Sequence, residues 1–150
     1  MIIIQFIASF IALVSFSIGI EIPKKYIIIV GLVGAIGWLV YLETIALGGT
    51  ELLAYFLSAL IVTIFSMLLS KILKTLSTIF IIPGILPIVP GAAMYNMVYS
   101  LINGNSSKTG YYLLQALLIT GGIALAIFIA QSIKGIEIIR KDKKINENKI

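Results

Sequence analysis

The segment Thr75–Ile102, TLSTIFIIPGILPIVPGAAMYNMVYSLI, is apolar enough to enter a membrane, yet it contains three of the four prolines of the chain. Each of Pro83, Pro87 and Pro90 removes a backbone donor and sets its ring against the carbonyl group four residues earlier. Unpaired backbone groups at membrane depth are tolerated only where protein or a water-filled cavity meets them. The segment therefore predicts a discontinuous helix beside an internal site, an arrangement typical of transporter pockets.

The lengths of the two halves place the break near the middle of the membrane. At about 1.5 Å per residue, Thr75–Ile82 would rise about 12 Å and Pro90–Ile102 about 20 Å, against a hydrocarbon core of about 30 Å. Pro90 suits the first turn of the second half-helix, where the free amides of residues 91–93 would face the gap and favour an anionic group. The alternative is one helix kinked by proline, because the three proline rings share one helical face.

Composition points to an integral membrane protein. Sixty per cent of the 150 residues are hydrophobic and the mean hydropathy is +1.14, well above the values of a soluble domain. The net charge of +5 does not indicate nucleic-acid binding, because the basic residues form short clusters between apolar runs and in the C-terminal tail. The absence of cysteine and histidine excludes disulfides, thiolate or imidazole zinc sites and Cys–His or Ser–His–Asp catalysis. We expect no catalytic residues, no metal and no cofactor.

Hydropathy along the chain predicts an all-α integral membrane protein with about five transmembrane helices. The predicted spans cover residues 2–20, 26–47, 52–70, 75–102 and 111–133, the fourth being the broken one. A signal peptide is a weak alternative for the first span, because no positive residues precede it and no small-residue cleavage site follows it. The stretch 103–110 is typical of a polar loop. Residues 134–150 form a charged tail that we expect to fray or to lie on the membrane surface.

The distribution of positive residues predicts the orientation of the chain. The first loop, the third loop and the tail share one face in a five-span topology, and they hold ten of the eleven Lys and Arg residues. Lys108 lies alone on the opposite face. By the positive-inside rule, we expect a multi-pass protein of the cell membrane with its N-terminus outside and its tail in the cytoplasm.

The second predicted span carries a glycine face. Gly31, Gly34 and Gly37 recur every three residues within an apolar helix, which argues against a glycine-rich nucleotide loop. Small residues at this spacing open a smooth face for a neighbouring helix, as Ala8 and Ala12 do in the first span. The alternative is that the glycine face lines a transport path.

Three stretches of the chain form a recognisable set: EIPKK at Glu21–Lys25, GLVGAIGWLVY at Gly31–Tyr41 and, most specifically, STIFIIPGILPIVPGAAMY at Ser77–Tyr95. With them the chain resembles the small subunit of the threonine/serine exporter family, which matches the C-terminal membrane domain of single-chain exporters. The resemblance implies a second five-span subunit as partner and small amino acids or dicarboxylates as exported substrates. Size independently favours a partner or a second copy, because five helices hardly enclose a pathway that opens alternately to each side.

The exporter interpretation places the substrate at the break of the fourth segment. Tyr95 and Tyr99, one turn apart, offer ring faces to a substrate ammonium, with Asn96 beside them. Packing or interfacial anchoring explains these aromatic residues equally well, and Ser77 and Thr78 would either contact substrate or satisfy carbonyls freed by the prolines. The predicted substrate-binding set is Pro83, Gly84, Pro87, Pro90, Gly91, Tyr95, Asn96, Tyr99, Ser77 and Thr78.

Glu43 is the candidate for proton coupling. It is the one carboxylate within the predicted spans, about 6 Å before the outer end of the second span at 1.5 Å per residue. If it faces the bundle, burial would tune it to load and release protons near neutrality; the alternative is an interfacial carboxylate. One carboxylate is a poor catalytic set, so a membrane-embedded enzyme is a less favoured alternative. A non-transporting assembly subunit stays open.

Overall fold

The computed structural model describes residues 2–147, with side chains described as far as Ile133. The described residues form helices and short turns, with no strand among them, which confirms the all-α prediction. The helices in chain order are α1 (Ile2–Gly19), α2 (Lys24–Ala46), α3 (Glu51–Ile72), α4 (Thr78–Ile85), the short 3-10 helix η1 (Leu86–Ile88), α5 (Gly91–Ile102) and α6 (Ser106–Glu147).

Four of these helices are long and apolar enough to cross a membrane, namely α1, α2, α3 and the Ser106–Ile133 part of α6. The fourth predicted span consists of two pieces, Thr78–Ile88 and Gly91–Ile102, and the chain bends by 52° between them. Counted as one bent span, these pieces bring the total to five within the described residues. The structure therefore confirms a membrane protein of the all-α class whose fourth segment is broken.

Helix α2 lies at the centre of the bundle and packs on α1, α3 and α4. Its glycines make these contacts close, because a neighbouring helix already fills the space that a β-carbon would occupy. At Gly37 that neighbour is Val62 of α3. At Gly34 it is both Leu13 of α1 and the backbone of Gly84 in α4. The glycine face is thus a packing surface, as its spacing predicts.

Two buried clusters hold the first half of the broken segment within the bundle. Ile88 of η1 packs with Ala59 of α3 and Ile123 of α6 in one cluster. Phe80 of α4 packs with Tyr26 of α2 in the other, and their rings meet edge to face with centroids 5.5 Å apart. Helix α4 and η1 are therefore fixed by contacts with α1, α2 and α3, and Ile88 also belongs to the cluster that includes α6 residues.

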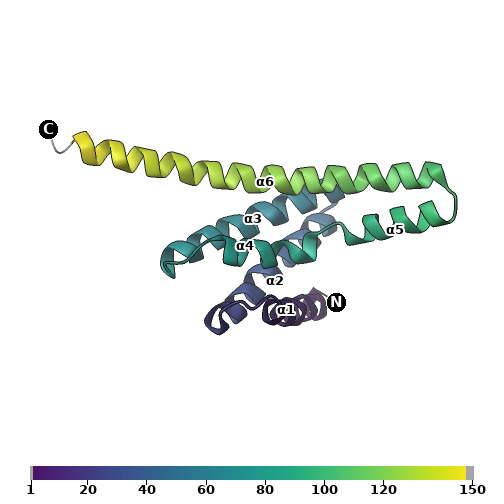
Figure 1. Ribbon diagram of the computed structural model, residues 1–150, viewed down its shortest axis with the longest axis horizontal. Coiled ribbons are helices and arrows are strands. Elements are labelled where there is room, and N and C mark those ends of the chain that lie inside the picture. Colours follow the sequence, from purple (N-terminus) through teal and green to yellow (C-terminus); the bar gives the residue numbers. More distant parts are fainter. Residues whose placement is uncertain (1, 148–150) are drawn as a thin grey trace.

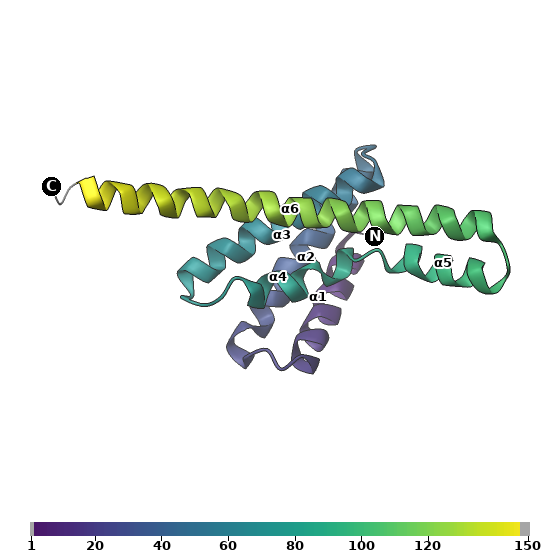
Figure 2. The same ribbon diagram turned by 45° about the horizontal axis from the view of Figure 1, so that its top comes forward.

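The second half of the broken segment, α5, leaves the bundle. Among the described elements α5 packs only on α6, and Figure 1 and Figure 2 show the two helices as a hairpin that extends past the other helices. The turn of this hairpin is shorter than the predicted loop 103–110, because α6 begins at Ser106. Asn105 caps the new helix: the Lys108 N–H donates to the Asn105 side-chain oxygen over 3.1 Å.

Helix α6 continues to Glu147, so the tail from residue 134 to Glu147 extends the last helix and does not fray; its place on the membrane surface stays a prediction. Lysine, arginine and glutamate have good helix propensity, which lets a charged stretch continue a spanning helix. Residues 148–150 of the predicted tail lie outside the described residues.

Left-handed backbone closes several helix ends. Helix α2 is followed by a glycine in this conformation, Gly48 at φ +82°. At the other end of the bundle, the turns after α1 and α3 use Glu21 at φ +58° and Lys74 at φ +49°. After α3 the Thr75 N–H donates to the Ser70 carbonyl over 3.1 Å, a bond typical of the Schellman motif. A β-carbon in this conformation is unfavourable, so Glu21 and Lys74 are points of local strain.

Candidate functional site

The broken segment stays helical for longer than its prolines suggest. Pro83 lies inside α4, which ends at Ile85 and not at the predicted Ile82. One side of α4 is buried against α2 and α3, and this packing offsets the donor lost at the proline. The backbone then tightens into η1, which contains Pro87, and becomes extended at Val89 with ψ 137°. The interruption therefore falls between η1 and α5, at the late end of the predicted range.

The start of α5 offers fewer free amides than the sequence predicts. The Gly91 N–H donates to the Val89 carbonyl over 2.7 Å, so this amide is already engaged. Pro90 is the N-cap residue of α5, and its carbonyl accepts from the Met94 N–H over 3.1 Å. The predicted anion site at this half-helix is thereby weakened.

Pro83 and Gly84 lie in the packed interior of the bundle. Both are buried, and a β-carbon at Gly84 would lie 3.0 Å from Val62 and 3.4 Å from Val33. Contacts this close leave no room for a solute beside Gly84. The structure thus places these two residues in helix packing, whereas Pro87 lines a groove.

That groove has a volume of about 330 Å³ and lies between α1, α2 and η1. It is lined by Gln5, Ala8, Ser9 and Ala12 of α1, Trp38 of α2 and Pro87 of η1. The α1 residues recur three or four positions apart, which places them on one face of their helix. Alanine side chains on this face are short and leave the space open. The broken segment therefore contributes one wall of a hollow, through Pro87.

Three side chains determine the chemistry of the groove. The Ser9 hydroxyl donates to the Phe6 carbonyl over 3.0 Å, so its oxygen remains available as an acceptor. The amide oxygen of Gln5 is buried and has no hydrogen-bond partner. Trp38 stacks on Tyr41 with ring centroids 5.1 Å apart, which restricts the orientation of the indole. The groove combines hydrogen-bond acceptors with an aromatic face, and its lining residues are uncharged.

Gln5, Ser9 and Trp38 are not among the site residues that the sequence suggests. A signal is nevertheless present, because Gln5 and Ser9 lie four positions apart in a span whose other polar residues are Ser15 and Ser17 alone. They therefore share a helix face with Ala8 and Ala12. What no sequence pattern shows is that η1 lies beside this face, since that contact depends on the tertiary packing of α4.

The predicted aromatic pair lies outside the groove. Tyr95 and Tyr99 of α5 stack on each other with centroids 6.2 Å apart, and they are 69% and 59% exposed. Asn96 beside them is partly buried. Because α5 packs only on α6 among the described elements, this pair is open to lipid or to another chain.

The remaining predicted residues are also dispersed. Ser77 precedes α4 as its N-cap residue but makes no side-chain capping bond, and Thr78 is exposed. Glu43 is exposed as well, three residues before Ala46, the last residue of α2. Glu43 therefore does not face the interior of its own chain, which is where the proton-coupling interpretation placed it.

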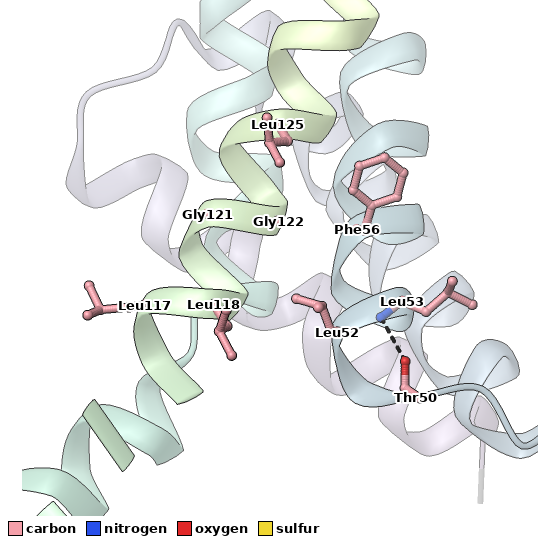
Figure 3. Close-up of a pocket in the computed structure, with 9 residues that line it drawn as sticks. All are labelled: Thr50, Leu52, Leu53, Phe56, Leu117, Leu118, Gly121, Gly122 and Leu125. Carbon is pink, nitrogen blue, oxygen red and sulfur yellow. Dashed lines mark hydrogen bonds between the residues drawn. The ribbon is translucent and has the colours of Figure 1, made fainter. Parts of the chain in front are cut away.

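A second hollow, of about 460 Å³, lies between the start of α3 and residues 117–125 of α6. Figure 3 shows leucine side chains of both helices around it, with Gly121 and Gly122 on α6. The hydroxyl oxygen of Thr50, its one polar side chain, accepts from the Leu53 N–H over 3.3 Å as a helix cap. An apolar hollow of this kind suits a hydrocarbon group, so of these two hollows the groove beside η1 is the better candidate site for a polar solute.

Within the described part of the chain, no group of three or more His, Cys, Asp or Glu residues is placed to hold a metal ion. A family model described as Threonine/Serine exporter, ThrE, matches residues 5–133, a range that includes every residue lining the groove. No curated protein and no solved structure matches the chain. Because the family model spans most of its length, the chain belongs to the threonine/serine exporter family, with the transporter-type role and multi-pass membrane architecture of that family.

Proposed function

We propose that the protein is a subunit of a secondary transporter that exports small amino acids, such as threonine or serine, or related small carboxylates across the cytoplasmic membrane. The observation that carries this proposal is the groove beside η1, whose lining includes the polar groups of Gln5 and Ser9, within a membrane domain. Irregular backbone at membrane depth is tolerated where it borders protein or a cavity. Membership of the exporter family supplies the transporter class.

A partner is expected to complete the pathway, either a second five-span exporter subunit or a second copy of this chain. Within the described part of the chain, α5 has only α6 as a neighbour, yet it carries the polar groups of Tyr95, Asn96 and Tyr99. Polar side chains of membrane helices usually meet other helices through hydrogen bonds. The groove is also open at the surface of the chain, so a covering partner would separate it from lipid.

The proposed orientation has the N-terminus outside and the C-terminus in the cytoplasm. Lys24, Lys25, Lys71 and Lys74 lie where α2 begins and α3 ends, and the positive-inside rule assigns that end of the bundle to the cytoplasm. Tags at the two termini of the protein in intact cells test the assignment, and only the N-terminal tag should react with an external antibody. An accessible C-terminal tag, or two tags on one side, would contradict the orientation or the five-span topology.

Transport by reconstituted vesicles tests the function itself. We expect flux of labelled threonine, serine or succinate when this chain is present with its partner subunit, and little flux when either is omitted. An assembled complex that moves none of the three solutes would instead favour a non-transporting assembly role. Chemical conversion of a labelled solute would point to the enzyme alternative.

A further inference from the structure

We propose that the groove between α1, α2 and η1 binds the ammonium group of the exported solute, with Gln5 and Ser9 as hydrogen-bond acceptors and Trp38 as an aromatic wall. This inference rests on the proposed function and narrows it. The structure then favours solutes that carry an ammonium group over dicarboxylates that have none.

The first observation is the unsatisfied amide of Gln5. Its side chain lines the groove, while its oxygen is buried without a hydrogen-bond partner. A buried acceptor without a partner is unfavourable, and a bound donor removes that cost. The terminal torsion of glutamine is broad and roughly two-fold, so the amide can turn its oxygen toward a ligand in the groove.

The second observation is that the other groups in the groove also suit a donor. The only proton of the Ser9 hydroxyl is used by the Phe6 carbonyl at 3.0 Å, so toward the groove Ser9 is an acceptor. The face of a tryptophan ring attracts cations through its quadrupole, more strongly than that of other aromatic residues. An ammonium group has three donors and one positive charge, and it can use both acceptors and the ring together.

The third observation concerns charge and size. The lining residues of the groove are uncharged, so a dicarboxylate would lack a counter-charge there. An ammonium group also lacks one, but it can use the oxygen acceptors and the ring face of Trp38. A volume of about 330 Å³ is at the small end of ligand pockets. Ala8 and Ala12 keep that volume free. A small ammonium compound fits these limits better than a larger or a purely anionic solute.

The test uses Trp38, which is the only tryptophan of the chain, as an internal fluorescent reporter. The full chain, in nanodiscs with its partner subunit made free of tryptophan, is titrated with L-serine, with ethanolamine, which keeps the ammonium group but lacks a carboxylate, and with succinate, which lacks an ammonium group. We expect serine and ethanolamine to change the Trp38 emission saturably and succinate to leave it unchanged.

Two substitutions of Gln5 and one control substitution test whether the ammonium compounds bind at the groove. Gln5→Leu should weaken serine and ethanolamine binding about tenfold or more, the amount expected when one hydrogen bond to a charged group is lost. Gln131→Leu is the matched control, because Gln131 is exposed on α6 and does not line the groove; it should bind as the parent does. Gln5→Glu keeps the acceptor and should retain binding, which separates recognition from misfolding if Gln5→Leu is unstable.

Several outcomes would overturn the inference. These are an emission of Trp38 that no ammonium compound changes, a response to succinate equal to that for serine, and equal affinity of Gln5→Leu and the parent. If the vesicles transport serine while Gln5→Leu binds and transports as the parent does, the groove assignment fails and the proposed function stands. If the groove binds serine and no solute is transported, the proposed function fails and the site remains.

Discussion

Replacing Gly34 with alanine places a methyl group where α1, α2 and α4 come together. The added β-carbon would overlap Cδ1 of Leu13, and it would lie 3.2 Å from the carbonyl oxygen and 3.3 Å from the α-carbon of Gly84. Leu13 is only 1% exposed, and the Gly84 contact is with backbone. The Gly84 contact can therefore be relieved only by a shift of α4, whereas Leu13 would have to change its rotamer within the buried interior.

The size of the effect follows from two opposed contributions. Overpacking of this kind costs about 1–3 kcal/mol, whereas alanine is favoured over glycine in a helix by about 1 kcal/mol. We therefore expect Gly34→Ala to lower the free energy of unfolding by up to roughly 2 kcal/mol. Gly121 of α6 is the matched control, because a β-carbon there would meet no atom within 4 Å. Gly121→Ala should keep only the favourable helix contribution and raise stability by up to about 1 kcal/mol.

Thermal unfolding of the two purified variants in the same detergent, followed by circular dichroism, measures the difference. For a chain of this size, 1 kcal/mol corresponds to about 2–4 °C in melting temperature. Gly34→Ala should therefore melt several degrees below Gly121→Ala. Equal melting temperatures, or a higher value for Gly34→Ala, would show that the glycine face of α2 is not a tight packing surface.

Three further predictions test other parts of the structure. Lys74→Gly relieves the left-handed strain after α3 and should raise the free energy of unfolding by roughly 0.5–1 kcal/mol; a lower melting temperature would argue against strain at this turn. In the chain, which has no native cysteine, Pro87→Cys should react with a polar maleimide because it lines the groove, while Gly84→Cys should be protected as a buried position; the reverse pattern would contradict the placement of η1. Because Glu43 is exposed near the end of α2, Glu43→Gln should leave proton-driven flux and its pH dependence unchanged in the reconstituted complex; loss of flux in an assembled variant would instead support Glu43 as the coupling group.

The break in the fourth segment could be predicted, because three prolines within one apolar stretch are incompatible with a regular membrane helix. The position of the break could not be predicted with the same accuracy. Pro83 is tolerated inside α4 because Phe80 and Gly84 are buried against neighbouring helices, and this tertiary packing overrides the local preference of the proline. The free-energy cost of the donor lost at Pro83 can be given from the sequence. The stabilisation from contacts with residues far along the chain cannot, because it depends on the tertiary structure.

The early start of α6 could have been predicted from the sequence. Asn105 is a favourable N-cap residue, and the lysines, arginine and glutamates beyond residue 134 have good helix propensity. The loop and the tail were instead predicted from their polar composition. Polarity correlates with irregular structure but does not cause it. The exposure of Tyr95 and Tyr99 was less accessible, since it depends on α5 leaving the bundle and packing on α6 alone among the described elements.

The groove depends on the same close approach that the glycine substitution tests. Helix α1 contacts α4 and η1 as well as α2, and Gly34 lies where Leu13 and Gly84 meet α2. A bulkier residue at this point would push α4 and α1 away from α2. Pro87 would move with α4, because η1 follows α4 directly. Gly34 thus links the fold to the candidate site: its missing side chain lets the broken segment reach the polar face of α1. Gly34→Ala should for this reason weaken serine binding as well as stability, whereas Gly121→Ala should change neither binding nor the Trp38 response.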